Sequence, residues 1–256
     1  MSHPLFDITG NTALVTGSSR GIGKALAKGL LEAGCAVVLN GRDTTALQAT
    51  AAELADSFGD RVRTAAFDVT DSAAVTTAIA RIEEETGPID ILVNNTGVQH
   101  RSPLLEFTDA DWHRLLDTNL TSAFLVGREV ARRMAPRGHG KIVNICSLQS
   151  EAVRPGIAAY SATKGGLKML TKGMCADLGP LGIQVNGIGP GYFATELTSA
   201  LVDDEQFSAW VRRRTPAGRW GGVADLVGAL IFLASPASDF VGGQVLYVDG
   251  GMLSVL

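Results

Sequence analysis

The 256-residue sequence has little of what marks several classes of protein. Its three cysteines and four histidines are scattered without metal-ligand spacing, so we expect reduced thiols and no metal site. The N-terminus lacks the basic and apolar regions of a secretory signal, and no apolar run is long enough to span a bilayer. The formal charge of −4 disfavours nucleic-acid or anionic-membrane partners. We therefore expect a cytoplasmic protein without membrane or nucleic-acid partners.

Short β-branched runs alternate along the chain with longer stretches of helical period. The candidate strands are Ala13–Val15, Ala36–Leu39, Arg63–Phe67, Ile89–Val93, Lys141–Ile145, Gln184–Ile188 and Gln244–Val248. The candidate helices are Gly21–Ala33, Thr44–Phe58, Ser72–Thr86, Asp109–Met134, Ala158–Leu178 and Val223–Ala234. Strands this apolar are typical of a parallel sheet that helices bury on both faces. The alternation predicts a single-domain α/β fold with a doubly wound sheet, whose ligands bind at the carboxyl ends of the strands.

Residues 189–219 depart from this rhythm. A Gly-Pro-Gly sequence opens the segment, and aromatic residues in it are mixed with charged ones. Because the segment follows the carboxyl end of a strand, we interpret it as a lid over the substrate. A surface helical hairpin would have a similar composition.

The segment Thr16–Gly23 follows the first candidate strand and opens a helix. Gly17 permits a tight turn, Gly21 lets the backbone approach a pyrophosphate, and Gly23 allows close packing of helix on strand. The helix N-terminus then offers free N–H groups to the phosphates. A glycine pattern alone could be an ordinary turn, but the strand–turn–helix context predicts a dinucleotide site. Its candidate residues are Gly17, Ser19, Arg20, Gly21, Ile22 and Gly23.

The end of the second strand, Asn40-Gly41-Arg42, predicts NADP(H) rather than NAD(H). An NAD site would place a carboxylate there for the ribose 2′-hydroxyl, and this charge would repel a 2′-phosphate. Asn40 and Gly41 remove the repulsion, and Arg42 and Arg20 are candidates to bind the phosphate, although either could be a solvated surface charge. Further candidates that would border the adenosine half are Asp68, Val69, Asn95 and Gly97.

Tyr160 and Lys164 lie four residues apart in a candidate helix and therefore share one face. A neighbouring ammonium would lower the pKa of the phenol, so we expect Tyr160 to exchange a proton with a substrate oxygen. Ser147 would hydrogen-bond that oxygen, and Lys164 could also hold the nicotinamide ribose. Taken singly, these residues could equally be helix-surface or turn residues.

In combination, several motifs resemble the classical short-chain dehydrogenase/reductase family over nearly the whole chain: Thr16–Gly23, Asn94–Gly97, Asn119, Ser147, Tyr160, Lys164 and Pro190-Gly191. The resemblance implies a seven-stranded Rossmann sheet, usually a homotetramer, and the catalytic tetrad Asn119, Ser147, Tyr160 and Lys164. In that tetrad, Asn119 positions the lysine through a water. The resemblance also implies cofactor contacts at Pro190, Gly191 and Thr195. Thr96 departs from the alanine usual in the family, and its hydroxyl could crowd the adenine ribose or add a hydrogen bond.

Polar side chains crowd the predicted strand-end loops, which suits a polyhydroxy acid better than a steroid or an acyl chain. The segments Asn144–Glu151, Lys168–Cys175, Pro190–Glu196 and Arg214–Gly221 also resemble family members that act on sugar acids. We therefore expect interconversion of a ketone and a secondary alcohol, with Arg101, Ser147, Gln149, Arg154 and Tyr192 as substrate residues. These groups could instead be rim residues or subunit contacts.

Two other functions remain open. A 3-oxoacyl carrier-protein reductase would use the same scaffold, with a basic patch and an apolar groove. A catalytically silent NADP-binding sensor would use the same fold, although it would have no need of the intact tetrad.

Overall fold

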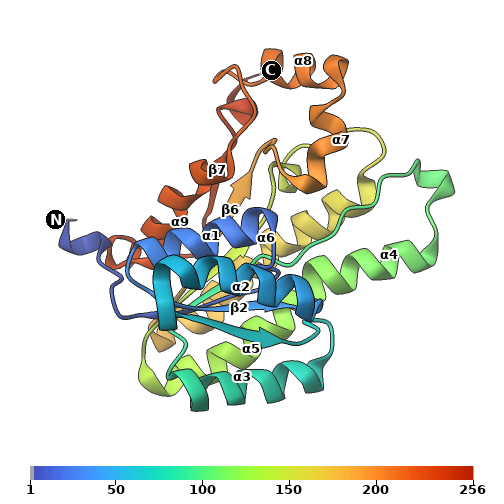
Figure 1. Cartoon of the computed structure of the whole chain (residues 1–256). Helices are drawn as coiled ribbons and strands as arrows, with labels where there is room; N and C mark the ends of the chain where they lie inside the picture. Colours follow the sequence, from blue (N-terminus) through green and yellow to red (C-terminus); the bar gives the residue numbers. More distant parts are fainter. Residues whose placement is uncertain (1–2, 256) are drawn as a thin grey trace.

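A computed structural model describes residues 3–255 of the chain. Its single sheet has seven strands in the order β3-β2-β1-β4-β5-β6-β7, all paired in parallel (Figure 1). The strands are β1 (Thr12–Val15), β2 (Ala36–Gly41), β3 (Val62–Ala66), β4 (Ile91–Asn94), β5 (Gly140–Ile145), β6 (Ile183–Pro190) and β7 (Val245–Val248). The predicted doubly wound, seven-stranded parallel sheet is thus confirmed.

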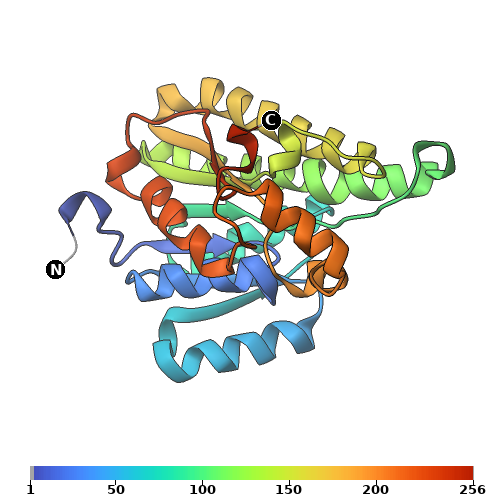
Figure 2. The same ribbon diagram turned by 90° about the horizontal axis from the view of Figure 1, so that it is seen from above.

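Helices cover both faces of this sheet. They are α1 (Gly21–Glu32), α2 (Thr44–Phe58), α3 (Ser72–Thr86), α4 (Asp109–Leu116), α5 (Ser122–Met134), α6 (Ala158–Leu178), α7 (Ser199–Val202), α8 (Glu205–Arg214) and α9 (Val227–Ala234). One core cluster joins the sheet to α1, α2 and α9, and a second joins the other face to α3, α5 and α6. Seen from above, α1 and α6 accordingly lie on opposite sides of the strands (Figure 2).

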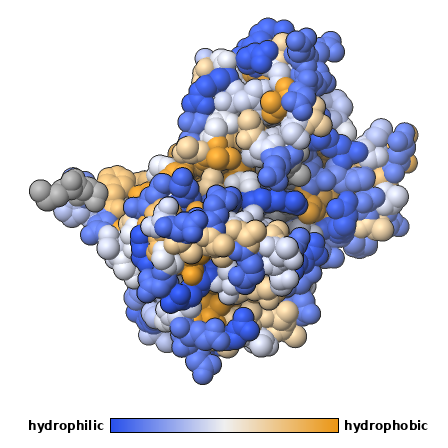
Figure 3. Space-filling view, viewed as in Figure 1, coloured by the Kyte–Doolittle hydropathy of each residue, from blue (hydrophilic) through white to orange (hydrophobic). Residues whose placement is uncertain are grey.

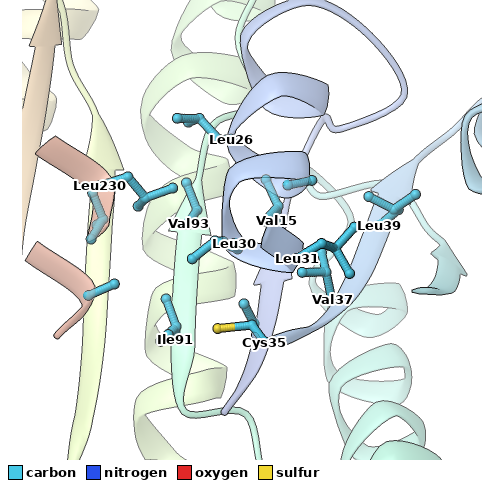
Figure 4. Packing of buried hydrophobic residues seen from close by; sticks show 14 of the residues in the cluster. Val15, Leu26, Leu30, Leu31, Cys35, Val37, Leu39, Ile91, Val93 and Leu230 are labelled. Carbon is cyan, nitrogen blue, oxygen red and sulfur yellow. The ribbon is translucent and has the colours of Figure 1, made fainter. Parts of the chain in front are cut away.

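The core beneath α1 shows why the apolar runs become inner strands. Leu26, Leu30 and Leu31 of the helix are fully buried and lie over Val15 and Val93 of the sheet (Figure 4). Successive residues of β1 face opposite sides, so its neighbour Leu14 enters the second cluster instead. Burying apolar side chains on both faces is what stabilises a parallel sheet. The face of the molecule in Figure 3 is mostly hydrophilic, because the helices turn their apolar sides inward.

Two expectations need correction. Burial on both faces holds for the five inner strands but is wrong for the edge strands β3 and β7, which are partly exposed. The helix expected over Asp109–Met134 is interrupted by a π-helical turn at Asp117–Thr121, between α4 and α5. A π-turn displaces the residues after it around the helix axis, and such turns are frequent at functional sites.

The 189–219 segment leaves the carboxyl end of β6 and carries α7 and α8, which lie above the sheet in Figure 1. Its base is closed by backbone hydrogen bonds from Ala194 N to Gly221 O (3.0 Å) and from Gly221 N to Tyr192 O (2.8 Å). A Cβ at Gly221 would lie 2.7 Å from the Phe193 ring, so this crossing requires glycine. Within residues 3–255, no helix is both long and apolar enough to cross a membrane.

Candidate active site

The sheet positions one large cavity at the carboxyl ends of its strands. β1 pairs with both β2 and β4. The strands that follow β1 in the chain, β2 and β3, lie on one side of it, and β4 to β7 lie on the other side. In such a sheet, the loops after β1 and β4 diverge and leave a crevice. The cavity there has a volume of about 490 Å³, and every candidate site residue except Asn119 lines it. Residues 3–255 contain no cluster of His, Cys, Asp or Glu side chains that could hold a metal ion.

The glycine loop between β1 and α1 forms the floor of one end of this cavity. Gly17 and Gly21 have φ values of 61° and 57°, in the left-handed region that favours glycine. A Cβ at Gly23 would overlap Gly17 O and the Asn95 side chain. The Asn95 amide donates to Thr16 O and Gly17 O, both at 2.9 Å, and so fixes the loop to the end of β4. The glycine loop and the N-terminus of α1 therefore line the cavity, and the three glycines allow a ligand to approach the backbone.

The end of β2 differs in part from the sequence-based expectation. Asn40 is buried, and its amide donates to Ala65 O and Phe67 O, each at 3.1 Å. Its side chain thus ties β2 to β3 and is not available to contact a cofactor phosphate. Arg42 is largely exposed and forms an ion pair with Asp68 at 3.2 Å. Asp43, the next residue, also lines the cavity and caps α2 by accepting from Ala46 N.

Thr96 packs tightly against the glycine loop. A Cβ at Gly17 would lie 2.9 Å from Thr96 Oγ1. That hydroxyl is buried and has no hydrogen-bond partner among the described residues. The alanine usual in the family would have no such hydroxyl. Thr96 therefore lowers the stability of the loop, because its buried hydroxyl forms no hydrogen bond within the described residues.

Helix α6 and the end of β5 bring Ser147, Tyr160 and Lys164 together at the inner end of the cavity. Lys164 is buried, and its Nζ donates to Ile145 O at 2.7 Å. The same Nζ lies 5.9 Å from the centroid of the Tyr160 ring. Burial lowers the pKa of Lys164 to about 8.

The expected lowering of the Tyr160 pKa is wrong for this structure. Burial raises the pKa of the phenol to about 12, and the Ser147 hydroxyl and the Arg101 charge offset this only in part. Lys164, whose Nζ donates to the Ile145 carbonyl, does not offset the effect of burial. Tyr160 is therefore a protonated phenol at neutral pH.

Asn119 lies behind this group, in the π-turn. Its Oδ1 accepts from Val98 N at 2.7 Å, and its Nδ2 donates to Val98 O at 2.9 Å and to Thr163 Oγ1 at 3.2 Å. A Cβ at Gly97 would lie 3.4 Å from Asn119 Oδ1 and 3.8 Å from Lys164 Nζ, so these groups converge beneath the loop after β4. Asn119 thereby connects that loop to α6, one residue before Lys164.

Ser147 and Gln149 form a pair in the loop after β5. The Ser147 hydroxyl donates to Gln149 Oε1, and Gln149 N donates to Ser147 Oγ at 3.2 Å. Gln149 Oε1 thus receives the proton that Ser147 would otherwise offer to a ligand oxygen. The nearby Ser150 hydroxyl donates to Lys164 O at 2.9 Å, which attaches this loop to α6.

Two arginines and an aromatic cluster form the outer end of the cavity. Arg101 donates to Gln99 Oε1 at 2.8 Å, and the guanidinium of Arg154 lies 5.4 Å from the centroid of the Phe207 ring. Tyr192 stands edge-on to Phe207, Trp210 and Trp220, with centroids 5.6–5.8 Å away. Burial and then the Arg154 charge lower the pKa of Arg101, and both guanidinium-bearing residues line the cavity.

The sequence did not identify two contributors to this site. Gln99 orients Arg101, and Phe207 of α8 supports Arg154 from more than 50 residues away in the chain. A polar residue in a loop and an aromatic residue in an amphipathic helix have no local pattern that distinguishes these roles from surface contact or packing. Thr195, in contrast, was singled out, and it begins the turn before α7 at the cavity wall.

Known proteins resemble this chain over almost its full length. A family model described as enoyl-(acyl carrier protein) reductase matches residues 17–253. The chain is 58% identical to gluconate 5-dehydrogenase of Gluconobacter oxydans over 253 residues, which cover 98% of each protein. It is 50% identical to 5-keto-D-gluconate 5-reductase of Escherichia coli over 252 residues, again 98% of each. A crystal structure of a gluconate 5-dehydrogenase from Burkholderia cenocepacia, in complex with NADP and tartrate, matches with a TM-score of 0.96 and 56% identity over 99% of each chain.

Proposed function

Because the chain belongs to the short-chain dehydrogenase/reductase family, we propose that it is an NADP(H)-dependent oxidoreductase that interconverts 5-keto-D-gluconate and D-gluconate. The observation that carries this proposal is the arrangement along one cavity. The glycine loop after β1, the group Ser147, Tyr160 and Lys164, and two arginines that form no ion pair within residues 3–255 all line it. The names of the most similar relatives support the same substrate.

The residues at the β2 end fit NADP(H). Gly41 puts no carboxylate at the position where an NAD site has one, and Arg42 and Arg20 are cations that line the cavity. On binding the phosphate, Arg42 would exchange its ion pair with Asp68 for the cofactor. The bound cofactor supplies or accepts the hydride. Gly17, Ser19, Ile22, Val69 and the other candidate cofactor residues named from the sequence line the same cavity.

The protein side chains would handle the proton. In the reducing direction, the raised pKa keeps Tyr160 protonated, which is the form that donates a proton to the developing alkoxide. The substrate oxygen would replace Gln149 Oε1 as the acceptor of the Ser147 hydroxyl and would be polarised by it. Lys164 would hold the nicotinamide ribose, and Asn119 would hold α6 in place behind it. The oxidising direction needs the phenolate, so it should be favoured at alkaline pH.

Arg101 is the group we assign to the sugar-acid carboxylate. A buried carboxylate requires a cation, and a planar guanidinium fixes its orientation as well as its charge. Arg101 and Tyr160 line the same cavity, and a substrate held by Arg101 would present its carbonyl to the Tyr160 hydroxyl. Gln99 holds the guanidinium in position.

We further propose that the chain is one domain with residues 189–219 as the lid, and that it forms a homotetramer in the cytoplasm. Apolar side chains exposed on α5 and along β7, such as Phe124 and Leu246, support burial against other copies. Size-exclusion chromatography with light scattering should give the mass of four chains, and the mass of one chain would contradict the proposal.

A panel of substrates tests the reaction itself. NADPH consumption by the purified protein should be fastest with 5-keto-D-gluconate, slower with neutral keto-sugars, and slowest with acetoacetyl thioesters. Good activity with the thioesters and none with any keto-sugar acid would assign the protein to 3-oxoacyl carrier-protein reduction instead. Cofactor binding without turnover of any of these compounds would favour a binding protein.

A further inference from the structure

Arg154 is a half-buried cation whose hydrogen-bonding capacity is unused. It lies in the loop between β5 and α6 and lines the cavity. Its Nε is buried without a partner, and no hydrogen bond or ion pair within residues 3–255 involves the guanidinium. Its described contact is with the face of the Phe207 ring, 5.4 Å from the centroid. A buried N–H without a hydrogen-bond acceptor is costly unless a ligand supplies one.

A second guanidinium without a carboxylate partner in the described part of the chain, that of Arg101, lines the same cavity. Arg101 bonds only to the neutral amide of Gln99, and it forms no ion pair in the described part of the chain. The two positive charges repel one another across the outer end of the cavity. An anion between them would remove the repulsion and satisfy donors of both groups, because a carboxylate has two oxygens and about four lone-pair sites.

We propose that Arg154 is a second ligand of the substrate's carboxylate and that, through Phe207, it makes the position of α8 depend on this anion. The inference rests on the proposed sugar-acid substrate and deepens it. Arg101 would orient the substrate from the loop after β4, whereas Arg154 would hold the opposite carboxylate oxygen. The enzyme would therefore select acids over neutral polyols at two points that lie on different loops.

Phe207 provides the link to the lid. Its ring packs with Tyr192, Trp210 and Trp220, which join α8 to the segment's base. Trp220 Nε1 also donates to Ser208 Oγ, at 3.1 Å, so α8 and the base are tied by a hydrogen bond. When the anion draws the guanidinium to a fixed position, the ring beneath it gains a fixed partner, and the stacking contact stabilises α8 over the cavity.

Binding of D-gluconate to the NADPH-saturated protein tests the proposal without turnover, because both compounds are the reduced members of their pairs. Isothermal titration calorimetry should show that Arg154→Met, which keeps the apolar stem, weakens gluconate binding about 10–100-fold. Arg101→Met should have a similar effect. The fold-loss of gluconate affinity in the double variant should be smaller than the product of the fold-losses in the two single variants, because both guanidinium groups hold the same anion.

Two controls separate this role from a structural one. Arg63→Gln, which removes an exposed cation from β3, should bind gluconate as the wild type does. Arg154→Met should retain wild-type affinity for NADPH. Wild-type gluconate affinity in Arg154→Met, or losses that simply multiply in the double variant, would overturn the proposal, and so would an equal loss of NADPH affinity.

Tryptophan emission tests the link to α8. In a Trp112→Phe background, the remaining tryptophans are Trp210 and Trp220, both within the aromatic cluster. Gluconate should change their emission in the NADPH complex, and Phe207→Leu should abolish this change while preserving most of the gluconate affinity. An unaltered change in Phe207→Leu would refute the link. Arg154-dependent binding of gluconate in a protein that reduces no keto-sugar acid would contradict the proposed reaction and leave the anion site intact.

Discussion

Lys164 is a buried ammonium, and replacing it with methionine should raise the stability of the protein while removing its activity. Burial lowers the pKa of Lys164 from 10.5 to about 8. This shift corresponds to about 3 kcal/mol of destabilisation at neutral pH. The hydrogen bond to Ile145 O, at 2.7 Å, would be lost in Lys164→Met and offsets about 1 kcal/mol. The variant should therefore gain about 2 kcal/mol in free energy of unfolding at pH 7.

The pH dependence of this gain has a defined sign. Between about pH 8 and 10.5, the unfolded chain binds a proton that folded Lys164 has released. The stability of the wild type therefore rises with pH through this window, and the penalty is fully present below it. Methionine does not titrate, so the gain of the variant should be largest below pH 8, and it should fall to zero and reverse slightly toward pH 10.5, where only the lost hydrogen bond remains.

Urea unfolding at a series of pH values measures this difference. Lys172→Met is the matched control, because it removes an exposed ammonium from the same helix and should change stability little. A Lys164→Met variant that is less stable than the wild type at pH 7 would show that the ammonium is compensated in the fold. A gain that stays constant from pH 7 to 10.5 would show that it does not arise from the charge.

The two ends of the cavity give three further expectations. Gly41→Asp combined with Arg42→Ala should favour NADH over NADPH, with a change of about 1.5–3 kcal/mol in the free energy that corresponds to the ratio of their kcat/KM values. The aspartate fits, because a Cβ at Gly41 meets only ordinary contacts of 3.5 Å or more. Equal use of both cofactors by the wild type would contradict the assignment. Thr96→Val should raise the free energy of unfolding by about 1 kcal/mol, because it removes a buried hydroxyl without a partner, and a loss in the same urea titration would mean that the hydroxyl is satisfied. Arg101→Ala should raise the KM for 5-keto-D-gluconate about 10-fold or more and leave neutral ketones unaffected, whereas equal losses would make Arg101 structural.

The sequence predicted most of the fold because the sheet is built from short apolar β-branched runs. All seven strands lie within a few residues of their expected positions. The incomplete burial of β3 and β7 depends on their place at the edges, which strand order decides and the local pattern does not reveal. The π-turn around Asn119 likewise has no signature in the 3.6-residue period.

The location of the site was also predictable, but the direction of individual side chains was not. Local motifs alone singled out the glycine loop and the pair Tyr160 and Lys164, and the fold brings both to one cavity. Asn40 turns its amide toward the carbonyls of a neighbouring strand, and Lys164 turns its ammonium toward Ile145 O. Both orientations depend on carbonyl acceptors that tertiary folding brings close. The spacing of residues in the sequence therefore could not predict that Asn40 connects β2 to β3 or that the pKa of Tyr160 is raised.

The kinetics of Tyr160→Phe test the central claim most directly, because this change removes one oxygen atom from the proposed acid. Steady-state reduction of 5-keto-D-gluconate by NADPH should lose about 10²–10⁴-fold in kcat, while the dissociation constant for NADPH, measured by fluorescence titration, should stay at the wild-type value. Near-normal turnover in Tyr160→Phe would show that another group donates the proton and would contradict the mechanism.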